Sequence, residues 1–277
     1  MMKRQFSLFD PILKFGLIIN TLLVLLPTFF VINASFRNTN DIFNAPLSLA
    51  ERFDLTNYRL VFEQGNFGRY FWNSLVVTGG SIVVILILGT LAGYALARYT
   101  FKLNNLVYIF FLTGLLIPAK LALVPLFIQL KNMGLLDSRI GLILLYSAGA
   151  LPAAVFIFTG FIKALPADLD NAARIDGASE LQVFRKIMLP LIVPVMSIVG
   201  IYSAIPIWND FLLPLVFIKD TSKMTIMQGM TVFFGEYAND WGGLFAGLSL
   251  AALPIVLLYV ILSGQFIKGL TAGATKG

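Results

Sequence analysis

The sequence contains neither cysteine nor histidine in its 277 residues. These absences exclude disulfides, thiol nucleophiles, zinc sites built from either residue and histidine proton relays. Charged residues are also scarce, at 12%, whereas ordinary soluble proteins have about 25%. The composition therefore argues against a soluble domain and against catalysis that depends on cysteine or histidine.

A nucleotide-binding loop of the GxxxxGK[ST] type is also missing. The segment GLTAGATKG at 269–277 has the wrong spacing and lies at a terminus, whereas such a loop joins a strand to a helix. The chain is therefore predicted not to hydrolyse ATP and to carry no cofactor of its own. Energy for any transport would come from a partner protein or an ion gradient.

Long apolar segments are abundant, and 58% of the residues are hydrophobic. Apolar runs of 18 residues or more are long enough to cross a bilayer as helices. No long alternating pattern of the kind found in membrane β-barrels occurs. The sequence predicts an all-α membrane protein with six transmembrane helices, at 13–35, 72–97, 106–129, 140–162, 191–218 and 243–264.

Proline is frequent inside these predicted spans: Pro27, Pro118, Pro125, Pro152, Pro194, Pro206, Pro214 and Pro254. A membrane helix tolerates proline where neighbouring helices or cavity water satisfy the freed carbonyls. Two interpretations remain open, a gated bundle that lines a cavity and a bundle with purely structural kinks.

The positive charges favour a cytoplasmic N-terminus. Eleven Lys and Arg residues lie on the N-terminal side of the predicted spans and eight on the other, with Lys120 inside a span. This topology accounts for the net charge of +6 better than nucleic-acid binding does. The outer hydrophilic segment 36–71 is either an interfacial anchor or a ligand site.

A polar segment, LDNAARIDGASELQVFRKIMLP at 169–190, interrupts the apolar sequence. Pro166 is suited to a helix start, and Gly177 can end that helix with a positive φ. Ser179 and Gln182 form a capping-box pattern that opens a second helix, whose predicted apolar face is Leu181, Phe184 and Ile187. Pro190 then introduces the next span.

Small side chains leave one side of the first helix nearly bare. Ala172 and Ala173 would allow another backbone to approach closely, which suits insertion into a partner's groove. The alternative is an amphipathic hairpin that lies on the membrane surface.

Ionisable side chains are rare within the spans, so Lys120 and Asp210 are candidate functional residues. Trp208, Asn209 and Asp210 could form a sugar-facing patch, or they could hold the kinked span through an interhelical hydrogen-bond network. Lys120 could contact a substrate or extend to the membrane interface.

The pattern NAARIDGAS…F…LP within 165–190 resembles the cytoplasmic coupling loop of bacterial ATP-binding-cassette importer permeases. The resemblance implies that this loop docks in a cleft of the ATPase subunit and transmits its closure. Asn171 departs from the family pattern, which usually has Glu there. The implied coupling residues are Asn171, Ala172, Ala173, Asp176, Gly177, Ala178, Phe184 and Pro190.

Further segments extend this resemblance over nearly the whole chain. NSLVVT (73–78), AGYALARYTFK (92–102), IPAKLALVPLFIQLKNMGLLDS (117–138) and WNDFLLPLVF (208–217) are similar to the carbohydrate-uptake branch. The closing KGLTAGATKG resembles the tail of maltose-type permeases, which reaches between the two ATPases. Such a tail is too rich in glycine to form a stable helix alone.

The resemblance implies a type I ABC importer permease of the maltose-type fold in the bacterial inner membrane, with both termini cytoplasmic. Its regions would be an N-terminal span and outer segment (1–71), a transmembrane core (72–264) and a cytoplasmic tail (265–277). The implied partners are a second homologous permease, an ABC ATPase dimer, an extracytoplasmic solute-binding protein and membrane lipid, with no nucleic acid.

This reading makes the chain a non-catalytic permease subunit of an ATP-driven sugar importer that works by alternating access. A polyol or glycerol-phosphate permease is an alternative within the same class. An ion-coupled secondary carrier is an alternative from another class, but the sequence lacks inverted repeats and a chain of membrane acids.

Overall fold

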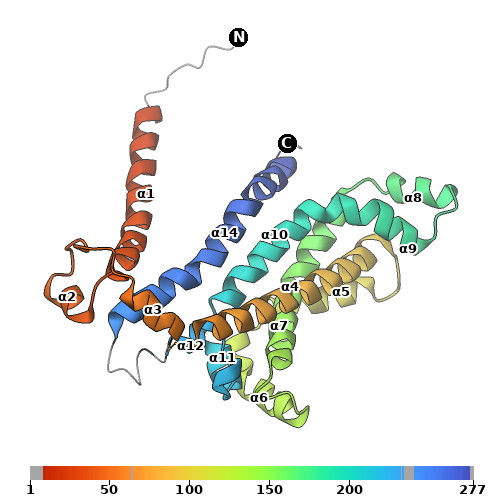
Figure 1. The fold of residues 1–277 in the computed structure, drawn as a ribbon. Coiled ribbons are helices and arrows are strands. Elements are labelled where there is room, and N and C mark those ends of the chain that lie inside the picture. The colour runs from red at the N-terminus through yellow and green to blue at the C-terminus, as the bar shows by residue number, and fades with distance from the viewer. Residues whose placement is uncertain (1–8, 64, 232, 234–239, 275–277) are drawn as a thin grey trace. The chain divides into compact units, whose positions relative to one another are not determined.

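The structure, a computed structural model, describes residues 9–63, 65–231, 233 and 240–274. Within these ranges it consists of helices and connecting loops, with no strand (Figure 1). The chain divides into two compact units. One comprises residues 1–67 and 229–252, and the other comprises residues 68–228 and 253–277.

The first unit contains one long apolar helix and several short polar elements. Its helices are α1 (Phe9–Ala34), α2 (Thr39–Asn44), α3 (Thr56–Glu63) and the first part of α14 (Trp241–Ala274). Edge-on aromatic contacts join α14 to α1 and α2, with ring centroids 6.0 Å apart for Phe30–Phe245 and 5.7 Å for Phe43–Trp241. The apolar side chains of α1 from Leu13 to Leu26 are exposed, as expected for a helix in contact with lipid or other subunits.

The second unit is built around three long helices, α4 (Phe67–Arg98), α7 (Arg139–Ala164) and α10 (Leu189–Trp208). Its core contains fully buried side chains from all three, among them Ile85, Phe158 and Ile192. Shorter elements complete the unit: α5 (Asn104–Gly114), η1 (Ala119–Ala122), α6 (Leu123–Asn132), α8 (Asp168–Ile175), α9 (Glu180–Val183), η2 (Phe184–Met188), α11 (Leu212–Phe217) and η3 (Thr221–Lys223). The helix α12 (Ile226–Gly229) ends at the boundary between the units.

Two glycines allow α4 and α7 to approach each other closely. A Cβ atom built on Gly93 would lie 2.6 Å from Cβ of Phe158 and 3.2 Å from the backbone nitrogen of Thr159. A Cβ atom on Gly89 would lie 3.0 Å from Cβ of Ala154. Gly89 and Gly93 are one helical turn apart, so together they provide a small-residue surface of the kind that packs membrane helices.

Among the residues that the structure describes, five helices are long and apolar enough to cross a membrane: Leu13–Ala34, Phe67–Arg98, Arg139–Ala164, Glu180–Trp208 and Trp241–Ile261. The predicted span at 106–129 is not a single helix, because α5 ends at Gly114 and α6 begins at Leu123. Pro118 has an extended conformation between them, since proline lacks the helical N–H and disfavours helix in the residue before it.

The predicted span at 191–218 is also interrupted. Helix α10 ends at Trp208, and α11 starts after the Asn209–Phe211 break. At its other end α10 begins earlier than predicted, since α9, the π-helix η2 and α10 run without interruption from Glu180 to Trp208. The π turn is closed by a hydrogen bond from Leu189 N–H to the Phe184 carbonyl.

The C-terminal segment is helical further than the sequence predicts. Helix α14 continues to Ala274, and residues 275–277 lie outside the described ranges. Glycine-rich sequence rarely starts a helix, because nucleation is the costly step. Here the segment forms the last part of the 34-residue helix α14, so no new nucleation is required.

Candidate functional site

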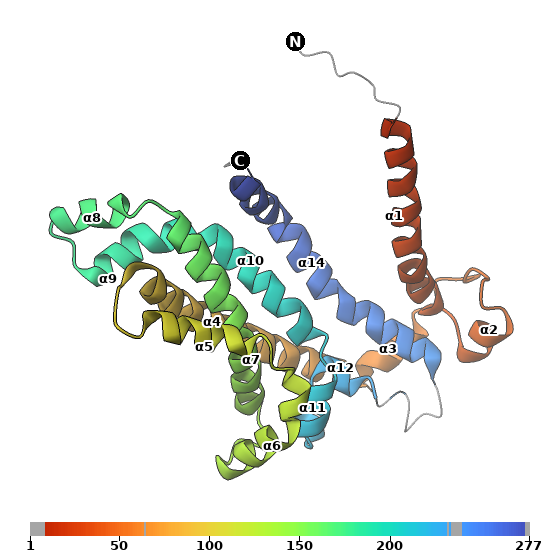
Figure 2. The same ribbon diagram turned by 180° about the vertical axis from the view of Figure 1, so that it is seen from behind.

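The segment 165–190, called here the 165–190 loop, lies at one end of the second unit. Figures 1 and 2 show α8 and α9 beyond one end of α10, whereas α6 and α11 lie at the opposite end of the same unit. Helix α8 follows α7 after a short turn, and α9 leads directly into α10. The loop is therefore a helical hairpin between two long helices.

The turn at Gly177 has the geometry that the sequence predicts. Gly177 has φ of +83°. Ala178 N–H donates to the Ala173 carbonyl at 3.0 Å, and Gly177 N–H donates to the Arg174 carbonyl at 3.0 Å. These two bonds form a Schellman motif, which satisfies the last carbonyls of α8 and fixes the direction of the chain.

The capping box at the start of α9 is also confirmed. Gln182 N–H donates to Ser179 Oγ at 3.4 Å, and Ser179 N–H donates to Gln182 Oε1 at 2.8 Å. Two backbone donors that the helix itself cannot satisfy are therefore paired.

The predicted apolar face of the second helix is wrong at Leu181, whereas Phe184 and Ile187 are partly buried. Leu181 is 62% exposed, and the buried positions are Val183 and Met188. Their spacing of five residues matches the π turn at 184–188, because a π turn contains about one residue more than an α-helical turn. Phe184 is partly buried and packs on Tyr94, with ring centroids 5.1 Å apart.

The two alanines of α8 have different environments. Ala172 is exposed, whereas Ala173 is 8% exposed and is buried by the chain's own residues. The surface of α8 that is available to a partner is formed instead by Leu169, Ala172 and Ile175, and Ile175 is 86% exposed. Sequence reasoning overlooked Leu169 and Ile175, although their spacing along α8 places them on the same face as Ala172.

The remaining predicted coupling residues are mostly accessible. Asn171, Asp176 and Pro190 are exposed, and Ala178 is partly buried. Asn171 Oδ1 accepts a hydrogen bond of 3.2 Å from Arg174 Nη1. Arg174 also contacts Glu180 through its Nε, at 2.8 Å from Oε1, so the neutral side chain at 171 joins a charged cluster within the loop.

Several contacts that the sequence analysis missed connect this loop to the end of α4. Arg98 Nε lies 2.6 Å from Asp170 Oδ2, and Tyr99 Oη donates to Glu180 Oε2 at 2.7 Å. The hydrogen bond to Glu180, with a smaller effect of burial, raises the pKa of Tyr99 to about 12. Tyr99 therefore remains a protonated donor across the physiological pH range. No local sequence pattern pairs these residues, because they are far apart in the chain.

The structure places the three predicted translocation residues in different environments. Trp208 is 3% exposed and packs edge-on against Phe71, with ring centroids 5.7 Å apart, while Asn209 is exposed. Asp210 accepts hydrogen bonds from Tyr146 Oη at 2.8 Å and from the Leu212 and Leu213 N–H groups at 3.1 and 3.2 Å. Asp210 therefore links α7 to the start of α11, as the hydrogen-bond-network interpretation expects.

Lys120 is exposed and lies in η1, within the interruption between α5 and α6. Its position next to a helix break, rather than within a continuous span, fits a side chain that extends towards a polar surface.

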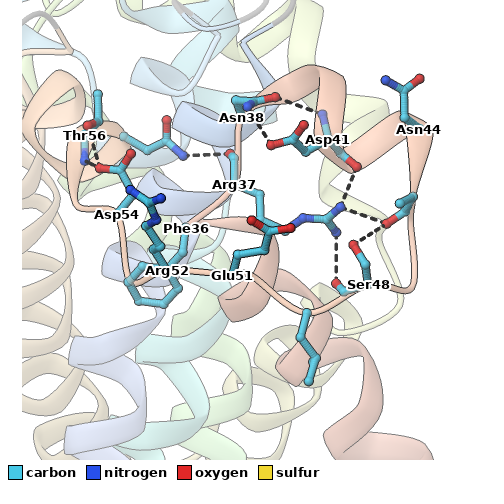
Figure 3. Close-up of a pocket in the computed structure, with 13 residues that line it drawn as sticks. Phe36, Arg37, Asn38, Asp41, Asn44, Ser48, Glu51, Arg52, Asp54 and Thr56 are labelled. Atoms are coloured by element: carbon cyan, nitrogen blue, oxygen red, sulfur yellow. Dashed lines mark hydrogen bonds between the residues drawn. The ribbon is translucent and has the colours of Figure 1, made fainter.

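A polar cavity of about 520 Å³ lies within the segment 36–57 of the first unit (Figure 3). Arg37 is 5% exposed and donates to the carbonyls of Ser48 at 3.1 Å, Ala45 at 2.8 Å and Asp41. Asn57 Nδ2 donates to the Arg37 carbonyl at 2.9 Å. The buried polar groups of this segment therefore stabilise its own loop, as a rigid anchor would require.

The described residues contain no group of three or more acidic side chains placed to hold a metal ion. The polar clusters at the 165–190 loop and at Asp210 are hydrogen-bonded networks between helices. Their arrangement can position elements relative to one another.

Comparison with known proteins identifies similar chains. Residues 85–271 match the family model described as "Binding-protein-dependent transport system inner membrane component". The diacetylchitobiose uptake system permease protein NgcG of Streptomyces coelicolor is 37% identical over 262 residues, which cover 94% of this chain and 87% of NgcG. The multiple sugar-binding transport system permease protein MsmG of Streptococcus mutans is 34% identical over 264 residues, covering 94% and 95%.

A solved structure has the same fold. It is the crystal structure of a bacterial ABC transporter involved in the import of the acidic polysaccharide alginate. One of its chains superposes with a TM-score of 0.80 at 20% identity, covering 96% of this chain and 99% of that chain. The expected importer-permease architecture is confirmed at the level of the fold.

Proposed function

Because this chain belongs to the family of binding-protein-dependent transport system inner membrane components, we propose that it forms half of the pathway of an ATP-driven sugar importer. It is a multi-pass permease subunit and not an enzyme. The proposal assigns ATP hydrolysis to a separate ATPase dimer, which the chain contacts through the 165–190 loop.

The observation that carries this assignment is the exposed apolar face of α8. Leu169, Ala172 and Ile175 present apolar surface at the tip of a polar hairpin. Such a helix face suits a groove on another protein. The Schellman turn at Gly177 and the capping box at Ser179 keep this face in a fixed orientation, which lowers the entropic cost of docking.

An amphipathic hairpin on the membrane surface is the alternative for this loop. A membrane-surface helix presents an apolar face beside basic residues. In α8 the exposed side chains instead include Asp168 and Asn171, and exposed Asp176 follows the helix directly, while the basic residue Arg174 is partly buried and paired with Glu180 within the loop. These acidic groups favour a protein partner over an anionic lipid surface.

The proposed substrate is a sugar, in particular an oligosaccharide. The relatives described above are named for diacetylchitobiose and for multiple sugars. These names favour a carbohydrate over a polyol or a glycerol phosphate, and they give no support to an ion-coupled carrier. The complete proposed assembly contains a second homologous permease and an extracytoplasmic solute-binding protein, with both termini of this chain in the cytoplasm.

Cross-linking tests the assignment of the 165–190 loop. The chain contains no cysteine, so a single Ile175→Cys substitution introduces one reactive thiol. The partner ATPase subunit, carrying single cysteines along its groove, should form a disulfide with Cys at 175 in membranes. Addition of ATP should change the yield, because closure of the ATPases alters the groove.

Leu47→Cys is the matched control, since Leu47 is also highly exposed, at 93%, but lies in the outer segment. This variant should not cross-link to the ATPase. If cysteines at 175 and at 172 give no cross-link in a complex that transports sugar, the loop is not the docking element.

A further inference from the structure

One buried ion pair joins three helices at the base of the 165–190 loop. Arg98 is the last residue of α4, and Asp170 lies in the first turn of α8. Their side chains are 8% and 1% exposed, and Nε of Arg98 lies 2.6 Å from Oδ2 of Asp170. Arg98 Nη2 also donates to the carbonyl of Leu165, the residue that ends α7, at 3.2 Å.

This ion pair is the main compensation for the charge of Asp170. Neither carboxylate oxygen accepts a hydrogen bond from the part of the chain that the structure describes, so the close contact with Arg98 balances the buried charge. Removal of one partner from a buried pair is strongly unfavourable, because the other charge remains without compensation. The Asp170 carboxylate is therefore held against the end of α4.

The second half of the loop is tied to the same helix end. Tyr99 Oη donates to Glu180 Oε2 at 2.7 Å, and Tyr94 packs on Phe184 with centroids 5.1 Å apart. Glu180 and Phe184 belong to the continuous helical segment that becomes α10. Both arms of the hairpin thus contact residues 94–99, which comprise the last turn of α4 and the residue that follows it.

We propose that Arg98 and Asp170 are positioning residues that transmit displacement of the 165–190 loop to α4. This inference rests on the proposed function, in which an ATPase moves the loop. Neither residue is part of the docking face, since both side chains are buried. A shift of α8 therefore carries Arg98 with it. The movement reaches α4 through the ion pair, and it reaches α10 through the covalent chain.

Single substitutions of the pair test this role in the full transporter complex with its solute-binding protein. Arg98→Gln and Asp170→Asn should leave the ATPase bound and ATP hydrolysis measurable. Sugar transported per ATP hydrolysed should fall about tenfold or more, within the range of typical coupling free energies. This ratio is measured per assembled complex, so a purely structural role would change the amount of complex and leave the ratio unchanged.

A matched control comes from the exposed ion pair of the same loop. Arg174 and Glu180 have side chains 33% and 52% exposed, and exposed pairs contribute little. Arg174→Gln leaves the Tyr99–Glu180 contact in place and should keep the wild-type ratio. The charge-reversed double variant Arg98→Asp with Asp170→Arg should recover part of the ratio that each single change loses.

A variant without buried charge covers the case in which the single changes prevent assembly. Replacing such a pair by apolar residues often preserves stability, so Arg98→Met with Asp170→Leu should assemble. A low ratio in this double variant supports the transmission role, and a wild-type ratio overturns it. An unchanged ratio in Arg98→Gln overturns it equally.

Cross-linking separates this inference from the proposed function. If Ile175→Cys does not cross-link in otherwise wild-type protein, docking of the loop is wrong. If Ile175→Cys cross-links both with and without Arg98→Gln, and Arg98→Gln keeps the wild-type ratio of sugar transported to ATP hydrolysed, docking is correct and only the transmission role fails.

Discussion

At the scale of single residues, Gly177 sets the angle between the two arms of the 165–190 loop. Its φ of +83° is strained for any L side chain, although a Cβ there would meet no atom within 4 Å. The cost of substitution is therefore a backbone cost, about 1–2 kcal/mol. That amount is comparable to a typical allosteric coupling free energy.

Gly177→Val is accordingly expected to insert into the membrane in normal amount, bind the ATPase weakly and transport poorly. Gly177→Asn should be closer to wild type, because asparagine adopts positive φ more readily than other residues. Copurification of the ATPase and sugar uptake measure both effects. Equal transport by the two variants would show that the angle of the turn is unimportant.

Local residue patterns were predictable, whereas contacts between distant residues were not. The positive φ at Gly177 and the Ser179–Gln182 capping box depend on neighbours within a few positions, so the sequence alone indicated them. The Arg98–Asp170 pair depends on how α4 and α8 meet in space. The burial of Ala173 depends on the same packing, and it excludes this alanine from the docking face.

At the scale of elements, the contact between α4 and α7 depends on glycine. Gly93→Ala would place a Cβ 2.6 Å from the Phe158 side chain and near the Thr159 backbone. Overpacking of this kind costs about 1–3 kcal/mol. The thermal unfolding temperature of the purified protein in detergent should fall as a result.

Gly79→Ala is the control on the same helix, since a Cβ at 79 would meet no atom within 4 Å. Its unfolding temperature should equal or exceed that of the wild type, because alanine favours helix over glycine. Similar losses in both variants would mean that α4 and α7 do not pack as closely as described.

Apolar length predicted where helices lie but not where they are interrupted. Pro152 is inside α7 and Pro254 inside α14 without ending either helix, whereas the chain at Pro118 leaves the helical conformation. Proline removes one hydrogen bond in every case. Whether the helix continues depends on the surrounding packing, which the sequence does not display.

At the scale of the whole molecule, the interrupted segment 104–132 decides how many times the chain crosses the membrane. Helices α5 and α6 contain 11 and 10 residues, so each spans only about 15–17 Å, roughly half of the hydrocarbon core. Together they can cross it as two half-helices joined at η1. The proposed location of both termini in the cytoplasm requires this crossing.

Thiol labelling in cells tests the crossing. Leu103→Cys and Met133→Cys introduce thiols at exposed positions, 58% and 56% accessible, on either side of the segment. A membrane-impermeant maleimide should label the cysteine at 133 in intact spheroplasts and the cysteine at 103 only after permeabilisation. Labelling of both in intact spheroplasts, or of neither, would show that 104–132 does not cross.

The π turn at 184–188 also affects which insertions and deletions the chain can accommodate. A π turn contains one residue more than an α turn between the same flanking turns. Deletion of exposed Arg185 should convert the π turn to an α turn and leave the helical segments on both sides in the same orientation. Deletion of one residue within α10 would instead rotate everything beyond it by about 100°. Functional relatives should therefore differ in length by one residue at this turn more often than inside the helix that follows.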